Sequence, residues 1–334
     1  MVENPQKSVE YADERPQQRR HPALAGHVMG TGTWAWGDRL MWGFGRGYSV
    51  EDLYAVFRES ISAEIRLFDT AEVYGRGRSE SYLGRFLAAY ADEVGETRQP
   101  VYIASKFAPF PWRLSRKSLL KALNNSLKRL GVERVDLYQM HMQLPPIAIE
   151  TWMEAMTEAV QSGKIDAVGI SNYDRSQMQR AYEVLSQEGA LLASNQVEYH
   201  LLNRAIETNG LLKHCSDLGV TVIAYSPLAM GILSGKYTVE NPPSGPRGRR
   251  YSRRFLAQTE PLITLLKKVG AAHAGKTAAQ VAINWTICKG TLPIPGAKTI
   301  DQIEQNVGVV GWSLTDEEVA LLDETSDRVL FGEK

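Results

Sequence analysis

The sequence predicts a single-domain (β/α)8 barrel, an α/β fold in which eight parallel strands alternate with helices. Eight short, strongly apolar runs recur along the 334 residues, and amphipathic stretches separate them. No break in composition divides the chain into two domains. An open, doubly wound sheet is disfavoured, because the first strand–helix turn, "GTGTWAWG", lacks the GxGxxG phosphate loop of that fold. The regular alternation therefore favours a closed barrel.

The eight apolar runs are the expected strands. Most are almost continuously apolar, which is typical of parallel strands that are covered on both faces. They occupy residues 27–33, 65–69, 101–106, 135–140, 165–170, 193–197, 220–226 and 291–295.

Helical periodicity fills the spaces between these runs. In residues 118–131 the leucines recur on one face, and Gly131 provides a stop signal. Residues 149–164 follow the same pattern. One connection, residues 229–255, is long and rich in Gly, Pro and Arg. A connection of this length is typically functional or disordered. Its arginine cluster could lie over a cofactor, but a solvated loop is the preferred interpretation.

Charge and cysteine content exclude several classes of protein. Lys and Arg number 38, and so do Asp and Glu, which gives no general attraction to nucleic acid or to a membrane surface. Cys215 and Cys288 lie far apart and form no metal-binding or redox spacing, so no metal is expected. No apolar run approaches the ~20 residues that span a bilayer.

The polar residues 1–22 are expected to form a flexible tail, and residues 23–334 the barrel. The tail lacks the apolar segment of a secretory signal. The expected location is the cytoplasm, or the plastid stroma for a plant protein whose transit peptide has been removed. The oligomeric state is left open.

Four chemically active side chains follow consecutive strands. Asp69 ends the second strand and Tyr74 lies in the loop after it, Lys106 ends the third, and His141 follows the fourth. The C-terminal strand ends of a barrel meet at one rim, where such enzymes carry their active sites. Each residue alone is more simply structural: a turn cap, a core tyrosine, a solvated lysine or a structural histidine. Their occurrence together favours a catalytic site.

This set of side chains suits the reduction of a carbonyl group. Hydride delivery to the carbonyl carbon requires a proton for the developing alkoxide, and a tyrosine can supply it. A buried lysine lowers the pKa of that tyrosine, and an aspartate offsets the cost of burying the lysine's charge. The histidine can orient the carbonyl oxygen through a hydrogen bond.

The chain resembles the aldo-keto reductase superfamily from about Gly30 to its C-terminal region. The motifs that carry the resemblance are "LFDTAEVYG", "YIASKF", "LYQMH", "GISNY", "NQVEYHLLNR", "AYSPLAMGILSGKY" and "PIPGAKTIDQIEQN". The resemblance implies a (β/α)8 barrel, a nicotinamide cofactor and a catalytic tetrad of Tyr74, Lys106, Asp69 and His141. Further segments, "WAWGDRLMWGFG", "KFAPFPWRL", "PSGPR" and "VAINWTICKGTLPIPG", resemble the pyridoxal reductases of plant plastids and their cyanobacterial relatives.

The resemblance also implies how NADPH is held. Ser171, Asn172 and Gln196 would bind the carboxamide, and Tyr225 would stack on the nicotinamide ring. A segment after the seventh strand would wrap the pyrophosphate through Ser226, Leu228, Gly231, Ser234 and Lys236. At the eighth strand end, Thr299 is a plausible helix N-cap and Lys298 suits the 2′-phosphate. The adenosine side would be completed by Pro295, Gly296, Gln302, Gln305 and Asn306; Gln305 departs from the family pattern, which has Glu there.

Aromatic residues in the first and third strand-end loops are expected to line an apolar substrate cleft. The set comprises Trp34, Trp36, Trp42, Phe44, Phe107, Phe110 and Trp112. About half are expected to touch substrate, foremost Trp34, Trp36, Phe107 and Trp112, while the others pack the loops.

The predicted function is NADPH-dependent reduction of a small aldehyde to an alcohol, with pyridoxal as the expected substrate. Two alternatives stay open: a broad carbonyl or methylglyoxal reductase, and a cofactor-binding regulatory subunit like the β-subunits of potassium channels. The second alternative is compatible with an intact tetrad, so only turnover separates it from an enzyme.

Overall fold

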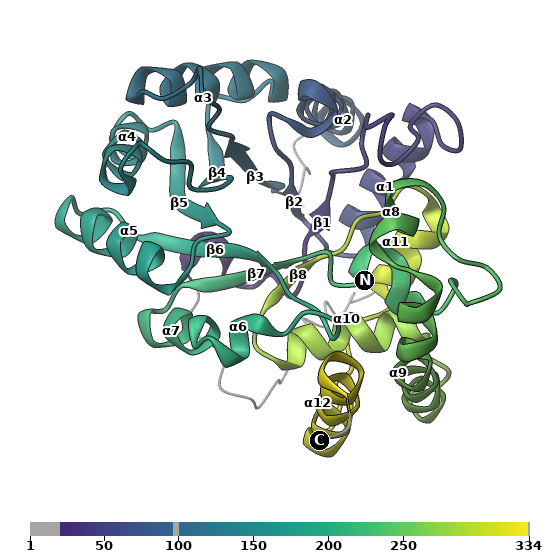
Figure 1. Cartoon of the computed structure of the whole chain (residues 1–334). Helices are drawn as coiled ribbons and strands as arrows, with labels where there is room; N and C mark the ends of the chain where they lie inside the picture. Colours follow the sequence, from purple (N-terminus) through teal and green to yellow (C-terminus); the bar gives the residue numbers. More distant parts are fainter. Residues whose placement is uncertain (1–20, 96–99, 333–334) are drawn as a thin grey trace, which may run out of the picture.

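A computed structural model describes residues 21–95 and 100–332 and confirms the barrel. Eight parallel strands form one sheet in the order β1 to β8, and helices surround it (Figure 1). The strands are β1 Thr31–Gly32, β2 Leu67–Asp69, β3 Tyr102–Phe107, β4 Val135–Met140, β5 Ile165–Ser171, β6 Leu192–Glu198, β7 Thr221–Tyr225 and β8 Leu292–Ile294.

Glycine closes the barrel between its first and last strands. Gly32 forms a parallel bridge with Gly296, and the Gly32 amide donates to the Pro295 carbonyl at 3.0 Å. A Cβ atom at Gly32 would lie 2.7 Å from the carbonyl oxygen of Ile294. No larger residue fits there without moving the backbone, so this glycine permits the close approach that completes the ring.

The helices follow the predicted periodicity. The helices expected in residues 118–131 and 149–164 are present as α3 and α4, and they begin and end close to the expected residues. The main helices are α1 Val50–Ser62, α2 Arg78–Val94, α3 Arg116–Leu130, α4 Ile149–Gln161, α5 Arg175–Gln187, α7 Leu211–Leu218, α9 Arg253–Ala272, α10 Ala278–Cys288, α11 Ile300–Val307 and α12 Asp316–Phe331. Shorter elements are η1 Pro22–Leu24, η2 Tyr74–Gly77, α6 Ala205–Thr208, η4 Ala229–Ser234 and α8 Gly245–Arg250.

Apolar side chains fill the N-terminal half of the barrel interior. They come from all strands but the first, and Leu24 of η1 packs against them. The strand members of this cluster are Leu67, Ala104, Leu137, Ala167, Ala193, Ile223, Leu292 and Ile294. Because this end is packed with apolar groups, polar chemistry is confined to the opposite, C-terminal end of the strands.

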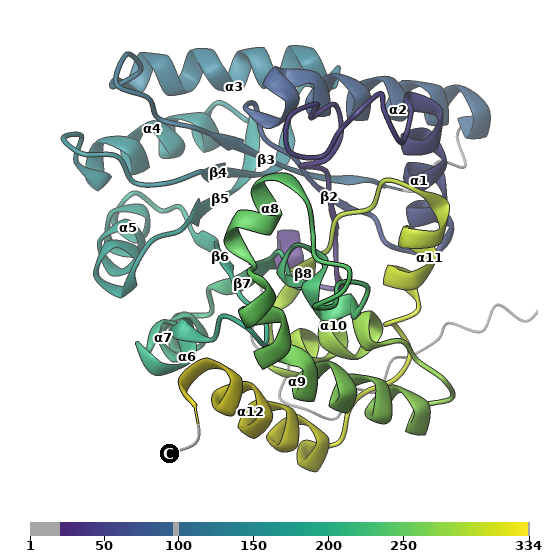
Figure 2. The same ribbon diagram turned by 45° about the vertical axis from the view of Figure 1, so that its right-hand side comes forward.

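The long connection after β7 folds back onto the rim of the barrel. Its helix α8 lies in front of the strands in Figure 2. Arg250 pairs with Glu198 at the end of β6 at 2.6 Å, and the Arg247 guanidinium lies 5.4 Å from the ring centre of Trp42. The expectation of a solvated arginine cluster holds for most of its members, since Arg249, Arg250, Arg253 and Arg254 are exposed, whereas Arg247 is half-buried against Trp42.

The predicted tail, residues 1–22, lies outside the described residues except for its last two. His21 caps η1 through its ring nitrogen, and Pro22 is the first residue of that element. Within the described ranges, no helix combines the length and apolar character needed to cross a bilayer.

Candidate active site

The barrel brings Asp69, Tyr74, Lys106 and His141 to the C-terminal rim. Asp69 is the last residue of β2, and Tyr74 opens η2 five positions later. Lys106 lies at the end of β3, and His141 follows β4 directly. The Tyr74 and His141 rings meet edge to face with centroids 5.8 Å apart. The four predicted side chains therefore occupy one place.

The Lys106 ammonium is completely buried and uses all of its hydrogen-bonding capacity. It donates to the Asp69 carboxylate, to the Thr70 carbonyl oxygen at 2.9 Å and to the Tyr74 hydroxyl at 3.3 Å. Asp69 is itself 2% exposed. A buried charge is tolerated when it is paired and fully hydrogen-bonded, and this lysine meets both conditions.

Opposing effects set the protonation of Tyr74 and Lys106. Burial raises the pKa of the Tyr74 hydroxyl, and the adjacent Lys106 charge lowers it only in part. Burial lowers the pKa of Lys106, but Asp69 and Tyr74 outweigh that effect and the net pKa is raised. Tyr74 therefore keeps its proton and Lys106 keeps its charge, the states that a proton donor and its electrostatic partner require.

His141 is held as a neutral imidazole. Burial, together with the nearby Lys106 charge, lowers its pKa to about 3. Its Nδ1 atom is buried and has no hydrogen-bond partner among the described residues. A buried N–H group without a partner costs more than a buried acceptor nitrogen without one. The ring proton therefore belongs on the other nitrogen, Nε2. A neutral ring with an Nε2–H can donate to a carbonyl oxygen.

A layer of amide side chains lies beneath the ion pair. Gln139 on β4 and Gln196 on β6 both donate through Nε2 to Asp69 Oδ2, at 3.1 and 2.8 Å. The Gln196 amide nitrogen also donates to Gln139 Oε1 at 3.2 Å. Both glutamines are buried, so Asp69 carries three charge-assisted bonds in a dry interior.

A second ion pair braces the loops around Tyr74. Glu72 accepts from the Ala108 amide at 2.8 Å and pairs with Arg113 at 2.9 Å. Arg113 in turn lies over the Phe107 ring, 4.6 Å from its centroid. These contacts join the loop that carries the tyrosine to the loop after β3.

The predicted carboxamide-binding residues form one hydrogen-bonded group at the ends of β5 to β7. Asn172 adopts a left-handed backbone with φ of 60°. Its side-chain nitrogen donates to Ser171 Oγ at 3.0 Å and to the His141 carbonyl oxygen at 3.3 Å, and its oxygen accepts from the Tyr225 hydroxyl at 3.1 Å. Ser171 Oγ donates to the Gln196 carbonyl oxygen at 2.8 Å.

The segment after β7 turns sharply. Ser226 and Met230 have left-handed backbones, and Gly231 has φ of 98°. Ser234 Oγ donates to the Gly231 carbonyl oxygen at 2.7 Å, and the Leu228 carbonyl accepts from the amides of Gly231 and Leu233. The expected pyrophosphate segment is thus a compact turn.

The segment after β8 leads into α11, and Thr299 occupies the N-cap position, although its side chain makes no capping hydrogen bond. Gln302 accepts from the Lys298 amide at 2.9 Å, and Asn306 donates to the Gly296 carbonyl at 3.4 Å. Gln305 is exposed and makes one side-chain contact with a neighbouring helix. Its Oε1 atom accepts from the Thr277 hydroxyl at the start of α10 at 2.9 Å.

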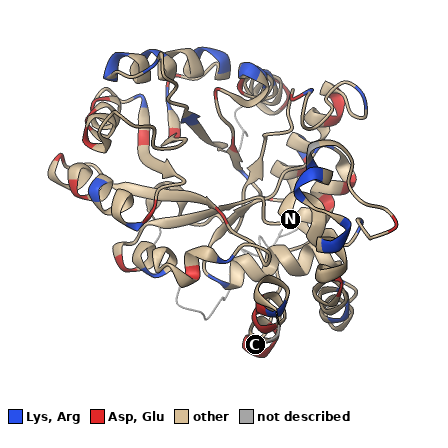
Figure 3. Ribbon diagram, viewed as in Figure 1, with Lys and Arg blue, Asp and Glu red and all other residues tan. Residues whose placement is uncertain are grey.

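Three cations gather on aromatic rings near this segment. Lys298 lies 4.9 Å from the ring centre of Tyr48 and 5.7 Å from that of Trp42, while Arg247 lies over Trp42 from the other loop. Lys236 lies over Tyr237 at 5.0 Å. Burial lowers the pKa of Lys298, and Arg247 and Lys236 lower it further. Blue ribbon marks the basic residues around α8 (Figure 3). A bound anion would relieve this concentration of positive charge.

The aromatic residues divide between rim and core. Trp34 lies beside the catalytic tyrosine, with its ring centroid 6.3 Å from that of Tyr74. Trp112 is 78% exposed and stacks on Phe110 at 5.1 Å. Trp36 and Phe107 have no exposed surface, and the Trp36 indole donates to the Ala297 carbonyl oxygen at 3.1 Å. The expectation that Trp36 and Phe107 line the substrate site is therefore corrected: they belong to the core.

Sequence reasoning missed two residues of this site. Gln139 carried a usable signal, because it is a polar residue within the otherwise apolar run "VDLYQM", two positions before His141. Alternation along a strand puts both on one face. Arg247 belongs to the arginine cluster for which a position over the cofactor was the less favoured interpretation. Its partner Trp42 is remote in the sequence, and only the folding of the connection brings the two together.

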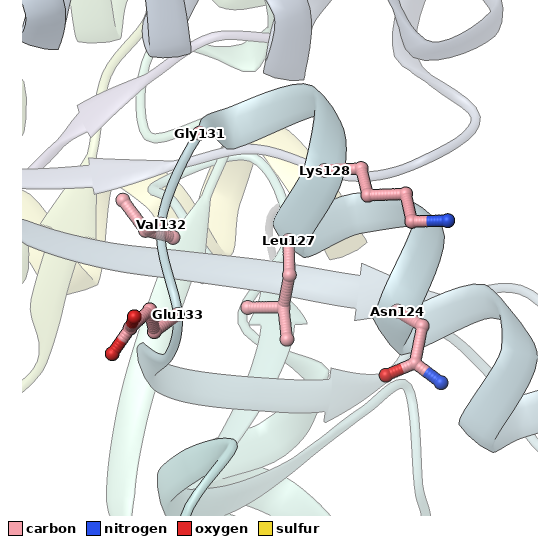
Figure 4. Close-up of a pocket in the computed structure, with 6 residues that line it drawn as sticks. All are labelled: Asn124, Leu127, Lys128, Gly131, Val132 and Glu133. Carbon is pink, nitrogen blue, oxygen red and sulfur yellow. The ribbon is translucent and has the colours of Figure 1, made fainter.

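A shallow surface depression lies far from this chemistry. It is lined by Asn124, Leu127, Lys128, Gly131, Val132 and Glu133 (Figure 4). These residues join the end of α3 to the start of β4, at the N-terminal end of the barrel. The depression is therefore separate from the tetrad at the opposite end.

Comparison with known proteins agrees with this geometry. The aldo/keto reductase family model matches residues 28–327. The chloroplastic pyridoxal reductase of Arabidopsis thaliana is 39% identical over 304 residues, covering 88% of this chain and 82% of that protein. L-glyceraldehyde 3-phosphate reductase of Escherichia coli O157:H7 is 34% identical, covering 84% of this chain and 85% of that protein. A solved aldo/keto reductase of Klebsiella pneumoniae, in complex with NADP and acetate, aligns with a TM-score of 0.68 at 30% identity, covering 89% and 90% of the two chains.

Proposed function

The chain belongs to the aldo/keto reductase family, and we propose on that basis that it reduces the aldehyde group of pyridoxal with NADPH. The observation that carries the proposal is the buried Lys106 ammonium, which bonds to both Asp69 and Tyr74. That arrangement gives Tyr74 a proton to donate and a fixed charge to stabilise the phenolate that remains.

The residues of the chain carry the proton-transfer half of the reaction. The Tyr74 hydroxyl accepts from Lys106, so its own O–H is free to donate to a substrate carbonyl oxygen. As that oxygen gains negative charge, the Tyr74 proton moves to it and Lys106 stabilises the phenolate. The neutral His141 ring donates a second hydrogen bond and orients the carbonyl. Bound NADPH would supply the hydride.

The donor set at the rim fits a phosphorylated dinucleotide. Asn172, Ser171 and Gln196 supply amide and hydroxyl groups suited to a carboxamide, and the Tyr225 ring lies beside them. Lys236, Arg247 and Lys298 supply the positive charge suited to phosphate, and the lowered pKa of Lys298 indicates a cluster that would gain from an anion. We assign the 2′-phosphate to Lys298.

Pyridoxal is the proposed substrate because two observations agree. The plant relative at 39% identity is a pyridoxal reductase. Trp34 beside Tyr74, and the exposed Trp112 on Phe110, offer aromatic surfaces against which a flat pyridine ring would stack.

A second candidate is the reduction of small aliphatic aldehydes. The similarity to L-glyceraldehyde 3-phosphate reductase supports this alternative. Steady-state rates with pyridoxal, methylglyoxal, L-glyceraldehyde 3-phosphate and an aromatic aldehyde, each with NADPH and NADH, separate the candidates. A kcat/KM for pyridoxal below that of every other substrate would refute the pyridoxal assignment. NADPH binding without turnover of any aldehyde would favour a regulatory subunit.

The proton donor is tested with Tyr74→Phe, which removes only a hydroxyl group. We expect NADPH affinity and melting temperature to stay near the wild-type values, while kcat falls by about 10²- to 10⁴-fold. A kcat close to that of the wild type would show that another group donates the proton.

A further inference from the structure

Gln139 is a completely buried amide that contacts the catalytic ion pair but cannot reach solvent. Its strand, β4, pairs with β3 so that Gln139 stands beside Lys106, and with β5 so that it stands beside Gly169. The side chain therefore points into the barrel, in the layer directly below the tetrad.

Gly169 makes room for this side chain. A Cβ atom at that position would lie 2.7 Å from Cγ of Gln139 and 2.6 Å from Oγ of Ser194. Even alanine would push the glutamine away from its partners. The absence of a side chain on β5 lets the Gln139 amide cross the barrel interior toward Asp69.

The carboxylate fixes the orientation of both amides. An ionised carboxylate only accepts hydrogen bonds, so Gln139 and Gln196 must each turn an NH2 group toward Asp69 Oδ2. The second N–H of Gln196 then donates to Gln139 Oε1. Both side-chain N–H groups of Gln196 are thus engaged inside the protein. The group that this side chain can offer to a ligand is its oxygen, Oε1, an acceptor for the NH2 group of a carboxamide.

We propose that Gln139 is a positioning residue for the reaction. It holds Asp69 and Gln196 in one hydrogen-bonded unit. This unit fixes the position of the Asp69–Lys106 ion pair beside Tyr74 relative to the Gln196 amide that would bind the nicotinamide carboxamide. The proposal rests on the function proposed above. Gln139 touches neither substrate nor cofactor. It acts through Asp69 on the proton donor and through Gln196 on the cofactor.

The first test removes the amide without removing its length. Gln139→Met keeps the volume of the side chain but loses the bond to Asp69 and the acceptor for Gln196. We expect kcat/KM to fall roughly 10- to 100-fold, and the Kd for NADPH, measured by quenching of protein fluorescence, to rise roughly 5- to 10-fold. Wild-type values of both constants would overturn the proposal.

The second test gives the position a titratable group. In Gln139→Glu the introduced carboxyl lies buried beside Asp69, and both effects raise its pKa. While protonated, it still donates to Asp69 and accepts from Gln196. Once ionised, it repels Asp69 and disfavours the Tyr74 phenolate. We expect the ratio of variant to wild-type kcat/KM to fall about tenfold between pH 6 and pH 8.5. A ratio that is independent of pH would overturn the proposal.

Asn195→Asp is the matched control for that variant. Asn195 is also a buried amide, and it stands next to Gln196 on β6, but its side chain donates to the Tyr173 carbonyl oxygen at 3.0 Å. This amide-to-carboxyl change should lower the melting temperature and leave the pH dependence of kcat/KM unchanged. The same pH dependence in both variants would overturn the assignment, because it would show that any buried carboxyl produces the effect.

A third measurement needs no turnover. Denaturant unfolding of Gln139→Met, Gln196→Met and the double variant forms a cycle on the cofactor-free protein. We expect the double variant to be clearly more stable than additivity predicts, because the two side chains share one interaction. Additive losses would overturn the proposal. If the losses are non-additive but the protein reduces no aldehyde, the proposed function is refuted, while the proposed hydrogen-bonded unit of Gln139, Asp69 and Gln196 is still supported.

Discussion

Replacing Asp69 by Asn tests whether the aspartate acts on catalysis through Lys106. The change removes the only carboxylate among the described residues that bonds to the buried ammonium, and it preserves the shape of the side chain. It also disturbs the amide layer, because the single oxygen of Asn cannot accept from Lys106, Gln139 and Gln196 together.

The magnitude follows from the burial of the lysine. Removing one partner of a buried ion pair costs about 3–5 kcal/mol of stability when the other charge is retained. Lys106 can avoid part of that cost by losing its proton, because burial lowers its pKa and only Asp69 and Tyr74 raise it. A neighbouring opposite charge typically shifts a pKa by about 1–3 units, so the high-pH limb of the kcat/KM profile should move to lower pH by that amount.

The assay is kcat/KM across pH for Asp69→Asn, Lys106→Met and the double variant. We expect both single variants to lose turnover, and the double variant to be little worse than Lys106→Met alone, since both changes act on one interaction. Losses that multiply, together with an unshifted pH profile in Asp69→Asn, would show that the aspartate serves another purpose, most simply as the turn residue that ends β2.

Two further changes test the ends of the site. Lys298→Ala should weaken NADPH binding by roughly 10- to 150-fold and leave NADH nearly unchanged, as expected for a charge-assisted bond to the 2′-phosphate, and an equal loss for both cofactors would place Lys298 elsewhere. His141→Gln should change the acid stability. The unfolded imidazole takes up a proton near pH 6.5, whereas the folded one stays neutral down to about pH 3. The unfolded chain therefore binds more protons between these values, and the free energy of unfolding decreases as the pH is lowered. Removing His141 should reduce the loss of unfolding free energy between pH 7.5 and pH 5 by about 1–2 kcal/mol, measured by urea unfolding, and an unchanged loss would mean that His141 titrates normally.

The periodicity of apolar residues and the positions of polar residues along the chain were sufficient to predict the barrel and the tetrad. Apolar runs recur along the chain because every parallel strand must be buried on both faces, and that requirement is local to each run. Once the barrel is assigned, a residue at a strand end is automatically at the rim. Asp69, Lys106 and His141 therefore needed no tertiary information beyond the fold class.

Tertiary structure alone decided which polar and aromatic side chains meet. Trp36 and Phe107 belong to the same sequence segments as Trp34 and Trp112, yet both are buried. Trp36 lies in an irregular loop, where the direction of a side chain depends on what packs against it, whereas Phe107 ends β3 and packs against Trp152 of α4. Arg247 reaches Trp42 only when the connection after β7 folds back over the rim.

The same distinction applies to the electrostatics of the site. The sequence indicated that a lysine near Tyr74 would lower the pKa of its hydroxyl, and the Lys106 charge does act in that direction. Burial acts in the opposite direction and is the larger effect, so the net pKa is raised. The sequence thus determined which groups form the site, because residue type and strand position are properties of the chain. The structure determined their protonation, because the cost of burying a charge depends on the surroundings that only the folded barrel creates.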